Sequence, residues 1–88
     1  AETAYRRVLA QLPGHAGALR NLGVLALQTG HAGPALELFD AALGRSPGDA
    51  ALHGQRGDAL LALGRLPEAI AALREATRFA PGDAVLWN

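Results

Sequence analysis

The stretch SPGDAAL at residues 46–52 returns almost unchanged as APGDAVL at 80–86 and, in a weaker form, as LPGHAGAL at 12–19. The prolines of the three copies follow one another at intervals of 34 residues, a period within the window of roughly 20 to 50 residues that is typical of repeat proteins. Proline ends a helix, glycine lets the chain reverse, and aspartate caps the next helix. The stretch therefore predicts one helix boundary per repeat.

Two complete units, 16–49 and 50–83, agree far from this boundary as well. Identical residues in matching positions are Ala16 and Ala50, Gly23 and Gly57, Leu27 and Leu61, Gly30 and Gly64, Ala35 and Ala69, and Ala42 and Ala76. Residues 1–15 match the closing helix of a preceding unit, and 84–88 match the start of another. We therefore expect a single solenoid segment over 1–88, with two full repeats flanked by partial repeats.

Each unit predicts two helices, and the fold class is all-α. In the first helix, apolar residues recur at the i, i+3, i+4, i+7 spacing of a buried stripe; they are Leu19, Leu22, Gly23 and Ala26. A turn is expected at Gly30 and at Gly64, and proline then favours a first helical turn near Pro34 and near Pro67. The second helix of the first unit should point these residues inward: Ala35, Leu36, Leu38, Phe39, Ala42 and Leu43. We expect Gly23 to face the turn that holds Ala35, so that the two helix backbones approach closely.

Composition excludes several classes of protein. Half of the 88 residues are apolar and only 5% are aromatic, so the core must be small and built mainly from Ala, Leu and Val. Eight basic residues balance eight acidic ones, and a chain without net charge has no summed field to attract nucleic acid. No apolar run approaches the roughly 20 residues that cross a bilayer. We expect a soluble, cytoplasmic protein that binds no nucleic acid and inserts into no membrane.

This pattern resembles the tetratricopeptide repeat family over the whole chain. The first unit supplies the family's positions with Leu19, Leu22, Gly23, Ala26, Ala35, Phe39, Ala42 and Pro47, and the second with Gly57, Leu60, Ala69, Leu73, Ala76 and Pro81. Outside the two units, Ala1, Tyr5, Val8 and Pro13 fit a closing helix, and Trp87 stands at the family's tryptophan position. The resemblance implies a right-handed superhelix that acts as a protein-interaction scaffold.

Two residues depart from the family pattern. His53 stands at a position that is usually Trp or Leu, and Arg56 stands at a position that is usually Leu. Arg56 either lays its stem along apolar surface with its head in water, or pairs with a neighbouring carboxylate such as Asp58. We favour the first alternative, because a buried ion pair is costly in a small core.

The resemblance implies that the first helices line a concave groove for a peptide or a partner helix. Carried over to this sequence, the groove residues are Arg20, Asn21, Val24, Leu27, Gln28, Gln55, Asp58 and Leu61, flanked by Gly17, Ala51, Gly54 and Ala62. Asn21 matches the asparagine ladder of the arrays attached to O-linked N-acetylglucosamine transferases and their bacterial relatives, and Gln55 is a longer amide at the next rung. Such amides hold a peptide backbone; the alternative is that both are solvated polar residues.

Catalytic and metal sites are not expected. Cysteine is absent, and His15, His31 and His53 lack the spacing of a zinc site. No phosphate-binding loop and no catalytic triad can be assembled, so we predict no enzyme activity and no cofactor. Besides a scaffold, two roles remain open: a substrate-recruiting arm of a larger, glycosyltransferase-like bacterial enzyme, and self-association through the terminal repeat faces, because each repeat must bury its apolar face.

Overall fold

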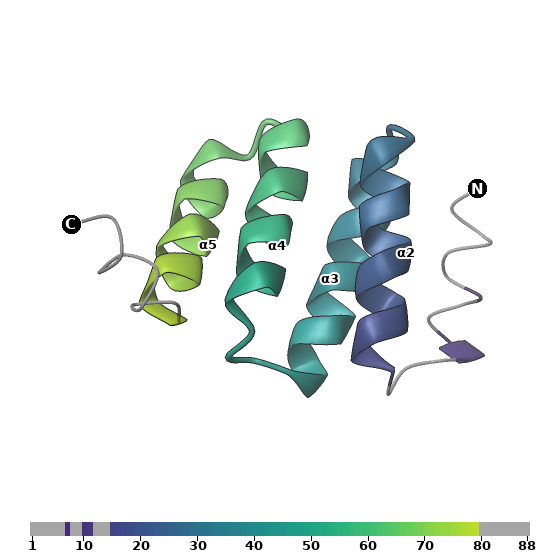
Figure 1. Ribbon diagram of the computed structural model, residues 1–88. Helices are drawn as coiled ribbons and strands as arrows, with labels where there is room; N and C mark the ends of the chain where they lie inside the picture. Colours follow the sequence, from purple (N-terminus) through teal and green to yellow (C-terminus); the bar gives the residue numbers. More distant parts are fainter. Residues whose placement is uncertain (1–6, 8–9, 12–14, 80–88) are drawn as a thin grey trace.

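The computed structural model describes residues 7, 10–11 and 15–79, which form an array of helices (Figure 1). Within 15–79 these are α2 (Ala16–Gln28), α3 (Ala32–Arg45), α4 (Ala50–Ala62) and α5 (Leu66–Phe79). The all-α fold predicted from the repeat period is confirmed. The predicted flanking elements, with Tyr5 and Trp87, lie outside the described residues, apart from Arg7, Ala10, Gln11 and His15.

The helices pack in chain order. Helix α2 packs against α3, α3 against α4, and α4 against α5, while α2 also touches α4 (Figure 1). The first helices of the two repeats, α2 and α4, are therefore neighbours, and α3 is enclosed by α2 and α4. Helix α5 packs mainly on α4. None of the helices within 15–79 is long and apolar enough to cross a membrane.

The two turns inside the repeats have the same geometry, as their matching sequences predict. Gly30 and Gly64 adopt φ values of 84° and 76°, in the left-handed region that glycine occupies without steric cost. The N–H after each glycine donates five residues back, from His31 to Ala26 at 2.8 Å and from Arg65 to Leu60 at 2.9 Å. This bond satisfies a carbonyl of the last helical turn; the carbonyl of Ala26 also accepts from Oγ1 of Thr29 at 3.1 Å.

The two boundaries that lead into α2 and α4 differ. Asp49 caps α4, and its Oδ1 accepts a hydrogen bond from the N–H of Leu52 at 3.3 Å. His15 occupies the same place before α2 and makes no side-chain cap. The predicted cap at Asp49 is confirmed, and the start of α2 lacks that stabilisation.

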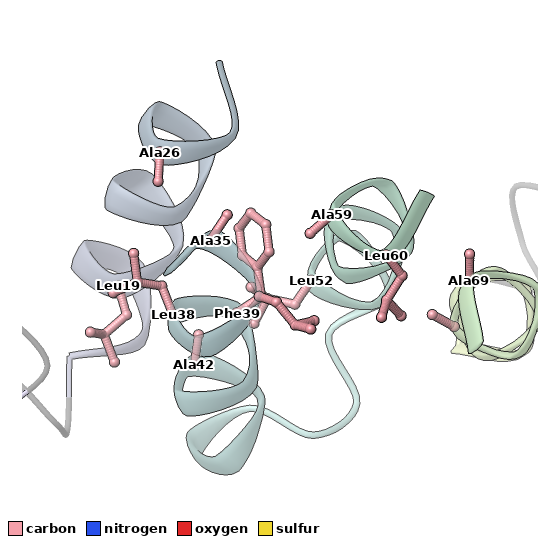
Figure 2. Packing of buried hydrophobic residues seen from close by; sticks show 12 residues of the cluster. Leu19, Ala26, Ala35, Leu38, Phe39, Ala42, Leu52, Ala59, Leu60 and Ala69 are labelled. Atoms are coloured by element: carbon pink, nitrogen blue, oxygen red, sulfur yellow. The ribbon is translucent and has the colours of Figure 1, made fainter. Parts of the chain in front are cut away.

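The core runs through both repeats (Figure 2). Its largest fully buried side chains are Leu19, Leu38, Phe39, Leu52 and Leu60. The predicted inward positions of α2 and α3 are buried, except that Leu22 and Leu43 are half-buried and pack against the core. Figure 2 shows side chains of α2, α3 and α4 converging around Phe39.

The glycines of the first helices allow close packing with the second helices. A Cβ added at Gly23 would lie 2.6 Å from Cε1 of Phe39, so Gly23 faces the Phe39 ring, one helical turn beyond the expected Ala35. In the second repeat, a Cβ at Gly57 would lie 3.0 Å from Cδ2 of Leu73 and 3.5 Å from the carbonyl oxygen of Ala69. The larger aromatic ring of the first repeat fills the space that glycine leaves.

Candidate functional site

The predicted site residues lie on the first helices of the two repeats, which contact each other. We call this set of side chains the first-helix face. It consists of Arg20, Asn21, Val24, Leu27 and Gln28 on α2, and Gln55, Asp58 and Leu61 on α4. The fold therefore places both predicted groups on adjacent helices.

Most polar side chains of the first-helix face have no partner in the described part of the chain. Asn21, Gln28 and Asp58 are exposed and Arg20 is half-buried, and none of the four side chains makes a hydrogen bond or ion pair with another described residue. Their donors and acceptors therefore remain available to a ligand.

The apolar side chains of the first-helix face differ in their exposure to solvent. Val24 and Leu27 are half-buried and pack against the core, whereas the side chain of Leu61 is 45% exposed. An apolar group of a ligand would therefore find its largest contact at Leu61, on α4.

Gln55 differs from the other polar residues of the face. Its Oε1 is buried and has no hydrogen-bond partner among the described residues, and leaving a buried polar atom unsatisfied costs about 1–3 kcal/mol. The sequence placed this amide at the surface beside Asn21. To offer both amide atoms to a ligand, the Gln55 side chain must rotate.

Arg56 joins the two repeats, and here the favoured sequence interpretation is wrong. Its Nε donates to Oδ1 of Asp40 on α3 at 2.5 Å, and the side chain is 30% exposed, so its head is bound rather than free in water. The alternative, an ion pair, is correct in kind but not in partner. Asp58 lies two residues further along α4, on a different side of the helix, and is exposed.

His53 ties the start of α4 to the end of α5, a role that the sequence did not indicate. Its Nε2 lies 2.7 Å from the carbonyl oxygen of Pro47, which only accepts, so this nitrogen carries the proton. The imidazole stacks on the ring of Phe79 at a centroid distance of 5.2 Å, and the Arg78 guanidinium lies 5.5 Å from the same ring centroid. The stack replaces the bulky apolar residue usual at this position.

Two further ion pairs involve residues outside the first-helix face. Arg65 donates two hydrogen bonds to Glu68, at 2.8 and 2.5 Å, and these lower the pKa of the Glu68 carboxyl and raise the pKa of Arg65. Arg78 pairs with Glu75 within α5. In the described residues no group of three or more His, Asp or Glu side chains is placed to hold a metal ion.

Comparison with known families agrees with this architecture. Two models of the tetratricopeptide repeat match the sequence, one over residues 27–88 and the other over 1–50. A comparison with curated proteins gives no match. The chain belongs to the tetratricopeptide repeat family, whose repeats typically form non-catalytic modules that bind other proteins.

Proposed function

We propose that the first-helix face binds an extended peptide segment of another protein. The observation that carries the proposal is a group of polar side chains on neighbouring first helices that have no partner among the described residues. Arg20 and Asn21 on α2 and Asp58 on α4 make no hydrogen bond or ion pair with another described residue, whereas Asp40, Glu68 and Glu75 on the second helices are each engaged by an arginine. Polar groups that the fold leaves unpaired on one face are those that a ligand can use.

The chemistry of these groups suits a peptide backbone. An extended peptide presents N–H and C=O groups that no secondary structure satisfies. The Asn21 carboxamide donates and accepts at once, so it can pair with both groups of one peptide unit. The Arg20 guanidinium presents a rigid fork of donors to carbonyl or carboxylate oxygens. Recognition of this kind grips the backbone without depending on side-chain identity.

Gln55 adds a second amide at lower energetic cost than its burial suggests. Because its Oε1 has no partner, rotating the side chain towards a ligand breaks no hydrogen bond of that oxygen. A peptide N–H would then satisfy an acceptor that is unsatisfied in the free protein. We propose that Gln55 turns outward when a peptide binds.

The apolar part of the face favours a particular peptide. Leu61 is nearly half exposed, and burying it against a ligand side chain contributes about 25 cal/mol per Å² of apolar area removed from water. We therefore propose a peptide that places one apolar side chain against Leu61 while its backbone meets Asn21 and Gln55. A concave shape of this face, implied by the family, belongs to the same proposal.

A displayed library of random peptides about 12 residues long tests the proposal, with the affinity of selected peptides measured by titration calorimetry. Replacing Arg20 and Asn21 together by Ala should weaken binding about tenfold or more, since each lost hydrogen bond contributes about 0.5–1.5 kcal/mol. Arg74→Ala is the matched control, because Arg74 is an exposed arginine of α5. Unchanged affinity of the double variant, with helicity preserved, would contradict the proposal.

Gln55→Leu separates binding from stability. Removing an unsatisfied buried oxygen should raise the midpoint of thermal unfolding, while loss of the amide should weaken the selected peptides. If the midpoint rises and the affinity stays the same, Gln55 does not take part in peptide binding.

A further inference from the structure

Asp58 differs from every other acidic residue within 15–79, because its side chain alone has no partner there. It is exposed in the interior of α4 and makes no hydrogen bond or ion pair with a described residue. The remaining acidic side chains of this range are all engaged; they are Glu37, Asp40, Asp49, Glu68 and Glu75. Aspartate is also a poor helix former in a helix interior. The fold therefore gains nothing visible from this carboxylate.

Arg20 supplies the opposite charge on the same first-helix face. Within 15–79 it is one of three arginines without an acidic partner, and the other two, Arg45 and Arg74, are exposed, whereas Arg20 is half-buried. A side chain that packing already restricts loses less conformational freedom when a ligand binds it. Arg20 is thus the unpaired arginine best prepared to bind a carboxylate, which its guanidinium can meet with two parallel hydrogen bonds.

The direction of the helices determines how these two charges are placed. Helices α2 and α4 lie side by side and run in the same direction (Figure 1). Asp58 matches Val24, four residues after Arg20, so it lies about 6 Å further along the helix direction. With helix axes about 8–10 Å apart, the two positions are separated by about 10–12 Å. An extended peptide, which rises about 3.3 Å per residue, spans this separation with about three or four residues.

We propose that the first-helix face selects a peptide that carries an acidic and a basic residue about three or four positions apart. The acidic side chain lies on Arg20 and the basic one on Asp58, while the backbone between them meets Asn21 and Gln55. Leu61 lies almost one turn beyond Asp58 on the same side of α4, so an apolar residue lies beyond the basic one. The proposal rests on the proposed function and makes Arg20 and Asp58 the residues that determine which peptides bind.

The two charges also fix the orientation of a given peptide. If the peptide turned round on the face, its basic residue would meet Arg20 and its acidic residue would meet Asp58, and both contacts would be repulsive. A single exposed ion pair changes affinity by up to about fivefold. Selection therefore depends on both pairs together, and the backbone contacts supply the rest of the affinity.

Selection from the displayed peptide library tests the inference, with the unmodified chain, Asp58→Arg and Arg20→Glu as baits. The unmodified chain should select peptides with the acidic and basic pair. Asp58→Arg should select a second acidic residue in place of the basic one, and Arg20→Glu a second basic residue in place of the acidic one. Ala71→Arg is the control, because Ala71 is exposed on α5, outside the first-helix face, and it should select the same peptides as the unmodified chain.

Titration calorimetry with one selected peptide measures the pairing at Asp58 directly. Asp58→Asn removes the charge and keeps the shape, and it should weaken binding about two- to fivefold. Replacing the basic residue of the peptide by Glu should weaken binding to the unmodified chain, and Asp58→Arg should restore it. Raising the salt concentration from about 0.05 to 0.5 M should reduce both effects, because salt screens exposed charges. Circular dichroism should show unchanged helicity, since Asp58 has no described partner to lose.

The same charge pattern in the peptides from all baits, or equal affinity of the unmodified chain and Asp58→Asn, would overturn the inference. Asn21→Ala tests the proposed function separately, because it removes a backbone contact and leaves both charges in place. If Asn21→Ala weakens binding and the charge variants do not, backbone recognition stands and the charge pattern is wrong. The reverse result would keep the charge pattern and contradict backbone recognition. A library that yields no binding peptide would overturn both.

Discussion

Helices α3 and α5 occupy the same place in successive repeats and have the same length, 14 residues, yet they are packed very differently. Phe39 is buried from all sides, whereas Leu73, at the matching position, is more than a third exposed. The burial of a repeat position therefore depends on how many helices pack around it, and less on which residue stands there. The first repeat should hold most of the stability of the described segment.

The largest test of this difference compares Phe39→Ala with Leu73→Ala. Removing a fully buried aromatic ring costs about 3–5 kcal/mol. Leu73→Ala removes a side chain that is partly in water already, and we expect about 1–2 kcal/mol. Urea unfolding followed by circular dichroism gives both free energies.

Phe39→Leu controls for the different side chains, because it gives the first repeat the residue of the second. It should cost less than Phe39→Ala and more than Leu73→Ala, since the site beside Gly23 stays enclosed. Equal losses for the two Ala variants would show that α5 is as well packed as α3.

A smaller difference is expected between Gly23→Ala and Gly57→Ala. Alanine gains about 1 kcal/mol over glycine inside a helix. At Gly23 the new methyl group would lie 2.6 Å from the buried Phe39 ring, and overpacking of this kind costs about 1–3 kcal/mol. At Gly57 it would meet Leu73 at 3.0 Å, a side chain that is 38% exposed and can move aside.

Thermal unfolding should therefore give a lower midpoint for Gly23→Ala and an unchanged or higher midpoint for Gly57→Ala. Combining Gly23→Ala with Phe39→Leu should recover part of the loss, because the smaller side chain makes room for the methyl group. Destabilisation of similar size at both glycines would mean that Leu73 is held as firmly as Phe39.

The sequence predicted the fold well because the fold follows from local signals. The proline-glycine boundary that recurs every 34 residues, the glycines of the two turns and the cap at Asp49 are each signals that act within a few residues of the chain. The unequal burial of Phe39 and Leu73 depends instead on neighbouring helices, which a repeat pattern treats as equal. The pair formed by Arg56 and Asp40 joins residues on two helices, and proximity in the sequence pointed to Asp58 instead.

The candidate site was predictable only in outline. Helix periodicity placed Arg20 and Asn21 on an accessible side of α2, and both are at least partly exposed. It gave no sign that Oε1 of Gln55 is covered, because the direction of a long side chain depends on what packs beside it. The stack of His53 on Phe79 was missed for a related reason: its two rings come from the start of one helix and the end of the next.

The smallest expected change in stability concerns the residues that precede the two first helices, α2 and α4. Asp49 caps α4 and His15 leaves α2 without a side-chain cap, so Asp49→Ala should destabilise by about 1 kcal/mol and His15→Asp should stabilise by up to a similar amount. Asp49→Asn is the control, since its side-chain oxygen still accepts the hydrogen bond from Leu52. Hydrogen exchange locates the effect: the first N–H groups of α2 should exchange faster than those of α4, and His15→Asp should slow them. Slower exchange at the start of α2 than at the start of α4 in the unmodified chain would show that another contact already holds this end of the first repeat.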